Sequence, residues 1–361
     1  MQLSELLGLA INSGASDVHL MVNAVPVFRL NGALVPVTDP RLAGLIPPHW
    51  QHRLLPEETF RLAGQVMNGS QLEKYQSIGE VDLSYSLPGV GRFRINIYRQ
   101  RGSTGLAIRP VKMEIPPLAS LGLPEVVARL ARLPRGLVLV TGPTGSGKST
   151  TLASMIELLN NEASLHIITI EDPIEYAHRH RNCLINQREI GQDTASFASA
   201  LRAAMREDPD VIMVGEMRDL ETIAGAITAA ETGHLVLATL HTSSAAQTID
   251  RIIDVFPPHQ QQQIRIQLSN TIQGVISQQL IPRSDGEGRV VAVEVMVATP
   301  AIRNLIRENK TYQIPSHIQS GGRYGMQSME MSLRNLYRAG LISREEAISR
   351  AGDPEGLVRL L

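Results

Sequence analysis

Nine consecutive residues have the types and the spacing of a phosphate-binding loop: Gly142-Pro143-Thr144-Gly145-Ser146-Gly147-Lys148-Ser149-Thr150. They match G-x-x-x-x-G-K-S/T, follow an apolar run at 137–140 and precede a helix-like stretch. Glycines let backbone N–H groups turn inward around phosphate oxygens, and the helix N-terminus adds the positive end of its dipole. Lys148 can reach the β- and γ-phosphates, and the Ser149 hydroxyl can ligate Mg²⁺. We therefore expect residues 142–150 to bind a magnesium-bound triphosphate.

Three carboxylates follow the second apolar run, in Ile170-Glu171-Asp172-Pro173-Ile174-Glu175. Carboxylates at the end of a buried strand are costly unless a cation accompanies them. Mg²⁺ with a nucleotide would account for them, and a solvated acidic turn is the alternative.

A third apolar run, 211–214, ends in Gly215-Glu216. The aspartate usual at this strand end in P-loop ATPases is replaced by Gly215. A glutamate directly after it can orient the attacking water or accept its proton. An apolar run that ends in Glu is common, so this prediction depends on the phosphate loop.

Two histidines, His234 and His241, bracket the apolar run 235–240. We expect both histidines at the same sheet edge as the acids, where they would sense the γ-phosphate or act in a relay to it. A histidine at a strand end can equally be a structural residue, and both interpretations stay open.

Several arginines gather before residue 110: Arg92, Arg94, Arg99, Arg101 and Arg109. Guanidinium groups stabilise charge in phosphoryl transfer and often come from a neighbouring subunit. Arg92 and Arg94 share one face of an alternating strand. A solvated strand face is the alternative.

The elements that must position these residues show two different sequence patterns, one before and one after about residue 110. Residues 1–110 predict a mixed α/β domain with antiparallel pairs. Its expected elements are helices at 2–13, 57–68 and 71–76, strands at 16–21 and 105–110, hairpins at 25–37 and 81–98, and a loop at 38–56. Beyond a proline-punctuated linker, four short apolar runs alternate with helical segments, as in a parallel sheet covered on both faces. After about residue 298 the pattern is mostly helical, and 301–308 has the period of an ordinary amphipathic helix.

Composition limits the function classes. The 361 residues suffice for two domains, and the net charge of −1 argues against broad electrostatic binding of nucleic acid. Cys183 is the single cysteine, so it forms no internal disulfide, and we expect a passive core thiol in a reducing cytosol. The N-terminus lacks a secretory signal pattern, and no apolar stretch reaches the roughly 18 residues of a membrane span.

Together these motifs resemble the secretion-ATPase superfamily and, within it, the retraction motors of type IV pili. The matching boxes are the phosphate loop 142–150, the acidic stretch 170–175, the strand 211–216 and the histidine stretch 232–242. Residues 14–20 and 215–222 are also similar to the family. The octapeptide 301–308 matches a motif associated with retraction rather than with ATP turnover.

The resemblance implies a homohexameric ring ATPase with ATP and Mg²⁺ bound between its domains, near the next subunit. Its implied parts are a PAS-like α/β N-terminal domain (1–112), a linker (113–122), a RecA-like P-loop ATPase core (123–298) and a helical C-terminal region (299–361). The implied partners are an inner-membrane platform protein and, indirectly, the pilin filament, without nucleic acid or direct membrane insertion. The implied location is cytoplasmic, peripheral at the inner membrane.

The resemblance also implies roles for individual residues. Lys148 binds phosphate and Ser149 holds Mg²⁺. Glu216 is the catalytic carboxylate, and Glu175 is the functional acid of the acidic stretch. His234 and His241 occupy the histidine positions, and Arg94 and Arg109 reach the γ-phosphate. Two departures are a longer segment at 40–56 and Gly102 where the family has an arginine, so that the roles of Arg99 and Arg101 stay open.

Alternatives remain within and beyond this family. Pilus assembly and type II secretion ATPases share the core boxes, but they usually carry paired CxxC zinc motifs and a long N-terminal extension. A paralogous retraction ATPase is closer, and 301–308 argues against it. A nucleotide-sensing scaffold and a nucleic-acid motor are the rivals from other classes.

Overall fold

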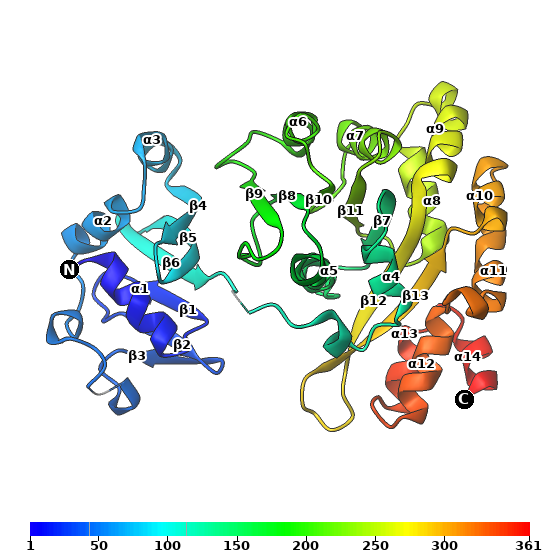
Figure 1. Ribbon diagram of the computed structural model, residues 1–361. Helices are drawn as coiled ribbons and strands as arrows, with labels where there is room; N and C mark the ends of the chain where they lie inside the picture. The colour runs from blue at the N-terminus through cyan, green and yellow to red at the C-terminus, as the bar shows by residue number, and fades with distance from the viewer. Residues whose placement is uncertain (43, 113) are drawn as a thin grey trace. The chain divides into compact units, whose positions relative to one another are not determined.

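The computed structural model describes residues 1–42, 44–112 and 114–361. The chain forms two compact units, one ending by Lys112 and the other beginning at Glu114 (Figure 1). Residue 43 of the expected loop and residue 113 of the expected linker lie outside the described residues. Each unit combines one sheet with helices, which confirms the α/β class.

The first unit has a sheet in the order β3-β2-β1-β6-β5-β4, and its described strand pairs are all antiparallel. Its strands are β1 (Asp17–Leu20), β2 (Val27–Leu30), β3 (Ala33–Pro36), β4 (Glu80–Leu87), β5 (Gly91–Gln100) and β6 (Ser103–Pro110). Its helices are α1 (Leu3–Asn12), α2 (Pro56–Gly64) and α3 (Gly69–Ile78). Both expected hairpins are confirmed. Asn31 and Gly32 turn the β2–β3 hairpin with φ of 48° and 84°, the left-handed backbone that a tight two-residue turn requires.

The described part of the segment 38–56 is mostly irregular, with short 3₁₀ turns at Pro40–Leu42 and Pro48–Trp50. Trp50 is fully buried, and its indole N–H donates to the Glu5 carboxylate of α1 over 2.8 Å. The neighbouring His49 ring also contacts this carboxylate, at 2.7 Å. This segment therefore packs against α1 as part of the core of the first unit.

The second unit has a sheet in the order β13-β12-β7-β11-β10-β8-β9. Its strands are β7 (Gly136–Thr141), β8 (His166–Glu171), β9 (Leu184–Glu189), β10 (Val211–Val214), β11 (Leu235–Leu240), β12 (Ile272–Pro282) and β13 (Arg289–Val297). The four apolar runs of the sequence form β7, β8, β10 and β11, and these are parallel as expected. The β12–β13 hairpin was not expected. It adds β12 in parallel to β7 and β13 in antiparallel to β12.

Helices cover both faces of this sheet (Figure 1). Along β7 the side chains alternate: Leu137 and Leu139 face one core, and Val138 and Val140 face the other. The first core is closed by α6 (Phe197–Ala204), α7 (Leu220–Glu231), α8 (Ala245–Asp254) and α9 (Pro258–Thr271). The second is closed by α4 (Val126–Ala131) and α5 (Lys148–Glu162). A sheet buried on both faces explains why its strands are continuous apolar runs.

The C-terminal part is helical, as expected. It comprises α10 (Pro300–Arg307), α11 (Ile314–Ser320), α12 (Met329–Arg338), α13 (Arg344–Arg350) and α14 (Pro354–Leu360). In α10, Ile302 and Ile306 are buried. Arg303 of this helix donates to the carbonyl oxygens of Ser269 and Asn270, at 2.7 and 2.9 Å, at the C-terminal end of α9. A cation at a helix C-terminus satisfies carbonyls that lack partners within the helix.

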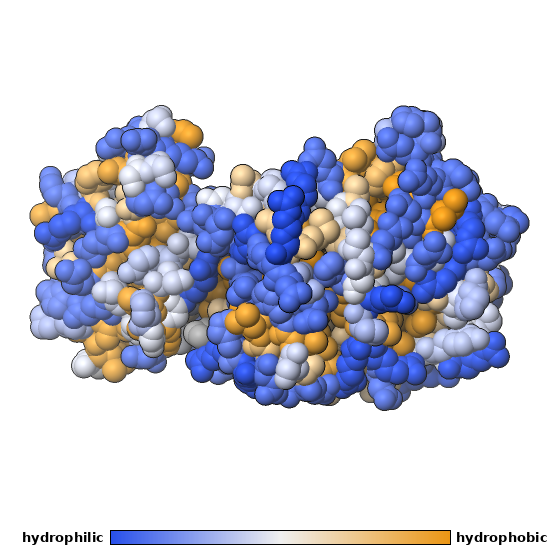
Figure 2. All heavy atoms as spheres, turned by 45° about the horizontal axis from the view of Figure 1, so that its top comes forward, coloured by the Kyte–Doolittle hydropathy of each residue, from blue (hydrophilic) through white to orange (hydrophobic). Residues whose placement is uncertain are grey.

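The face drawn in Figure 2 is mostly hydrophilic, and its apolar residues form separate patches. Cys183 is buried and its thiol contacts the Ala163 carbonyl, which confirms a core position. Across the described ranges we find no helix with the length and apolar character that crossing a bilayer requires.

Candidate active site

The phosphate loop joins β7 to α5 with a backbone that glycine favours. Gly142, Gly145 and Gly147 have φ of 142°, 79° and 92°. A side chain at Gly142 would collide with the backbone oxygen of Gln278 in β12. The loop therefore has the turns that direct amides toward a bound anion at the start of a helix.

Lys148 lies where this loop meets α5, as the first residue of the helix. Its ammonium group donates to the carbonyl oxygens of Gly142 and Pro143, at 2.8 and 3.0 Å. Burial lowers the pKa of Lys148, and the negative charge of Glu216 opposes that shift. The lysine and the glutamate thus belong to one electrostatic site. Ser149, next in the chain, is exposed at the first turn of α5.

Glu216 follows β10 and lies at the same edge of the sheet as the phosphate loop, which follows β7. The two share this edge because β7, β8, β10 and β11 run parallel. A Cβ at Gly215 would lie 3.1 Å from the Ile170 oxygen and 3.3 Å from the Glu171 Cα. The close approach of β8 therefore leaves little room for a side chain directly after β10, which favours glycine over aspartate at this position. The side chain of Glu216 is 18% exposed and forms an ion pair with Arg218.

The two histidines lie at opposite ends of β11, so the expectation of one shared edge is wrong. His241 follows the strand, and its Nε2 lies 3.0 Å from Oε2 of Glu216. His234 precedes the strand and hydrogen-bonds through Nδ1 to the Ala229 carbonyl, at 2.9 Å. The two histidines are seven residue steps apart along β11 and hence about 23 Å apart, since each step adds ~3.3 Å. The structure brings only His241 to the acids.

The acidic stretch after β8 divides into one internal carboxylate and two exposed ones. Glu171 is buried and accepts from Thr169 Oγ1 at 2.7 Å and from Gln187 Nε2 at 3.0 Å. Burial raises the pKa of the Glu171 carboxyl, against the opposing effect of these donors. Asp172 and Glu175 are exposed. The one buried acid is therefore satisfied by protein donors, and its position needs no cation.

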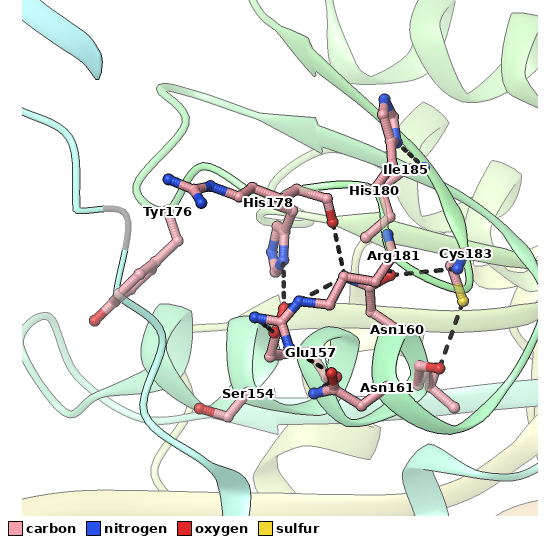
Figure 3. A network of polar contacts seen from close by, with 12 residues as sticks. Ser154, Glu157, Asn160, Asn161, Tyr176, His178, His180, Arg181, Cys183 and Ile185 are labelled. Carbon is pink, nitrogen blue, oxygen red and sulfur yellow. Dashed lines mark hydrogen bonds and ion pairs between the residues drawn. The ribbon is translucent and has the colours of Figure 1, made fainter. Parts of the chain in front are cut away.

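The segment after Glu175 is hydrogen-bonded and ion-paired to α5, the helix that follows the phosphate loop (Figure 3). The hydroxyls of Tyr176 and Thr150 share a hydrogen bond of 2.9 Å. Asn160 of α5 accepts from the backbone N–H of Arg181 at 3.2 Å, and Glu157 forms an ion pair of 3.0 Å with the Arg181 guanidinium. These contacts join α5 and the acidic loop, so we expect them to move together.

Arg94 and Arg109 belong to the first unit and lie directly opposite each other on β5 and β6. Nη2 of Arg109 is 2.8 Å from Oδ1 of Asp17, while Arg94 is exposed. Arg92 and Arg99 have neighbours within this unit: Arg92 donates to Ser86, and Arg99 lies over the Tyr75 ring.

A magnesium site made by protein ligands alone is absent from the part of the chain that the structure describes, where no three His, Cys, Asp or Glu side chains cluster suitably. The exposed hydroxyl of Ser149 beside the loop fits an ion held mainly by nucleotide phosphates and water, which is the usual mode for Mg²⁺.

Three residues that lie near the site received no role in the sequence analysis. Arg218 pairs with Glu216, Tyr176 bonds to Thr150, and Gln278 contacts the phosphate loop. Arg218 follows Glu216 by two residues, so a search for a cation beside the acid could have found it. The contact of Gln278 depends on strand pairing across the sheet.

A glycine-rich loop between a buried strand and a helix, with its lysine coupled to an acid on a parallel strand, defines the class of P-loop nucleotide-binding proteins. The family described as Type II/IV secretion system protein matches residues 117–348, which is more than half of the chain. The chain belongs to this family, which confirms the resemblance inferred from its motifs.

The relatives include pilus motors. The chain is 50% identical over 355 residues to a Pseudomonas aeruginosa protein described as type IV pilus retractation ATPase PilT, covering 98% of this chain and 99% of that one. It is 39% identical over 357 residues to the type IV pilus ATPase PilU of that organism, covering 99% and 90%. A crystal structure of the pilus retraction motor PilT with bound ADP has a TM-score of 0.88 and 51% identity, covering 99% of both chains.

Proposed function

We propose that this protein is an ATP-hydrolysing motor that retracts type IV pili and thereby drives twitching motility. One observation carries the proposal: the Lys148 loop and the Glu216–His241 pair share a sheet edge in a chain 50% identical to PilT over nearly its whole length. The lower identity to PilU, 39%, supports the PilT-like function over that paralogue.

In the proposed reaction, the amides of residues 142–150 and the Lys148 ammonium bind the β- and γ-phosphates. Binding draws Lys148 away from the carbonyls of Gly142 and Pro143, because phosphate oxygens compete for the same N–H donors. The Ser149 hydroxyl would help to hold Mg²⁺, and the ion when bound would supply positive charge that neutralises the phosphates.

Glu216 is the proposed group that orients the attacking water and accepts its proton. His241 donates a hydrogen bond to this carboxylate and Arg218 pairs with it, so that its orientation is fixed. Glu175 is retained as a proposed second acid, because it is exposed and follows a strand of the same edge. His234 is left out of this proposal, because it lies at the other end of β11.

The proposal extends to the assembly. We infer a homohexamer at the cytoplasmic side of the inner membrane, in which Arg94 and Arg109 supply charge to the γ-phosphate. The ring would act on a platform protein and, through it, on the pilin filament. Residues 1–112, 123–298 and 299–361 are the proposed domains.

The biochemical test is phosphate release by the purified protein with Mg²⁺ and ATP, with Lys148→Ala as the control that loses nucleotide binding. A wild-type protein that neither binds ATP nor releases phosphate would contradict the proposal and favour a scaffold. Stimulation of turnover by DNA would favour a nucleic-acid motor.

The cellular test separates retraction from assembly. Cells that lack the protein should keep surface pili and lose twitching. Loss of pili in such cells would instead favour a pilus assembly ATPase.

A further inference from the structure

Gln278, a buried side chain of β12, contacts both the phosphate loop and the helix α5 that follows it. Its Nε2 donates to the carbonyl oxygen of Ser146 at 2.8 Å, and its Oε1 accepts from Thr151 Oγ1 at 3.1 Å. The residue is only 2% exposed. A single amide therefore contacts the turn before Lys148 and the first turn of α5 after it.

The contact with Ser146 determines which way one amide of the loop points. In a trans peptide the C=O of one residue and the N–H of the next point in opposite directions. Because the Ser146 carbonyl is held toward β12, the Gly147 N–H is directed away from β12. That N–H precedes Lys148, in the part of the loop that surrounds phosphate in this class of site.

We propose that Gln278 is a positioning residue for the nucleotide, which presets the Ser146–Gly147 peptide with its N–H toward the phosphates. This inference rests on the proposed nucleotide binding. The amide is suited to the task because it donates and accepts at the same time. An ionised glutamate cannot donate to the Ser146 carbonyl, and methionine can serve neither contact well.

A neighbouring pair provides a matched control. Ser277, beside Gln278 on β12, shares a buried hydrogen bond of 2.8 Å with Thr141 of β7. The Ser277–Thr141 bond joins β12 to the strand before the phosphate loop. The bond from Gln278 to the Ser146 carbonyl joins β12 to the loop itself. Removing the Ser277 hydroxyl therefore costs sheet stability without releasing the Ser146 peptide.

The experiment measures binding of fluorescent methylanthraniloyl-ADP with Mg²⁺, together with thermal melting and steady-state turnover, in the full-length protein. Gln278→Met should raise Kd about tenfold, because neither hydrogen bond of Gln278 remains to preset the loop. Thr151→Val should raise Kd only ~2–3-fold, because the contact with Ser146 remains. Ser277→Ala should lower the melting temperature and leave Kd unchanged.

Two results would overturn the inference: wild-type affinity in Gln278→Met, or equal weakening by Ser277→Ala. If Gln278→Met does not fold, Gln278→Glu decides, measured at a pH high enough to ionise the buried carboxyl, since an ionised glutamate keeps the shape and loses the donor. Unchanged affinity of that variant at this pH contradicts the inference. The proposed function fails separately, if the wild-type protein itself does not bind the analogue.

Discussion

The Nε2 atom of His241 and the Oε2 atom of Glu216 lie 3.0 Å apart, although 25 residues separate them in the chain. The contact exists because β10 and β11 are parallel neighbours, so the residues that follow them meet at one sheet edge. A carboxylate held in this way has a fixed direction relative to the phosphate loop. We infer that the pair is the centre of the hydrolytic step.

Replacement of Glu216 by Gln should separate binding from turnover. We expect kcat to fall by a factor on the order of 10²–10⁴, because a neutral amide cannot accept the proton of water. Nucleotide affinity should stay near the wild-type value. Phosphate release and binding of the fluorescent ADP analogue measure the two effects.

Glu221→Gln is the matched control, since this acid on α7 is 68% exposed and pairs only loosely with Arg202, at 3.6 Å. Its turnover should equal that of the wild type. A Glu216→Gln variant with normal turnover would remove this residue from the mechanism.

The two histidines should give different phenotypes. His241→Ala should reduce kcat and leave the melting temperature nearly unchanged, because its ring contacts the Glu216 carboxylate at the sheet edge. His234→Ala should lower the melting temperature by the loss of a hydrogen bond to the Ala229 carbonyl and leave kcat nearly unchanged. Equal loss of turnover in both variants would contradict the separation of these residues along β11.

Arg94→Gln should cost activity without costing stability. Arg94 and Arg109 are directly opposite on neighbouring strands, and like charges in such a pair destabilise a sheet by roughly 0.2–1 kcal/mol. Asp17 pairs with Arg109 and also lies 3.6 Å from Arg29, on the side of β6 away from β5. We therefore expect an unchanged or slightly higher melting temperature together with slower phosphate release.

Arg61→Gln changes the charge of the same unit at an exposed position of α2 and serves as the comparison. If both variants hydrolyse ATP at the wild-type rate, the proposed action of Arg94 on phosphate is wrong.

Glu294→Gln should stabilise the protein in a pH-dependent way. Burial raises the pKa of the Glu294 carboxyl to about 7, with a further contribution from the nearby charge of Glu330 and an opposing one from the Ala245 N–H. The folded state thus binds this proton more tightly than the unfolded state, so the wild-type protein loses stability as pH rises from 4.5 to 7. Gln keeps an acceptor for the Ala245 N–H, which donates over 2.8 Å, and removes the charge.

The expected gain in unfolding free energy is near zero below pH 4.5, grows up to pH 7, and levels off on the order of 3 kcal/mol above it. Thermal melts across this pH range measure the gain. Glu287→Gln, an exposed acid between β12 and β13, should show no such growth. A gain that is equal at pH 4 and pH 8 would contradict the assignment to Glu294.

Local sequence patterns predict most of the second unit. A strand buried on both faces is visible as an apolar run, and the phosphate loop is visible as a motif. They do not say which strands are neighbours. Thr141 and Ser277 share a hydrogen bond across 136 positions, because β12 pairs with β7. The same strand pairing places Gln278 in contact with the phosphate loop. The histidines show the same limit, because a motif that contains both does not reveal that a strand separates them.

Arg303 fastens α10 to the C-terminal end of α9, and its other guanidinium nitrogen donates to Gln273 of β12 at 2.9 Å. Arg307, one turn later, is exposed. Loss of retraction after substitution of Arg303 would therefore be ambiguous, because the substitution also removes contacts that hold α10 to α9 and β12. Substitutions at the exposed Arg307 change the surface of α10 without removing the contacts with α9, so alanine scans across 301–308 must be interpreted position by position.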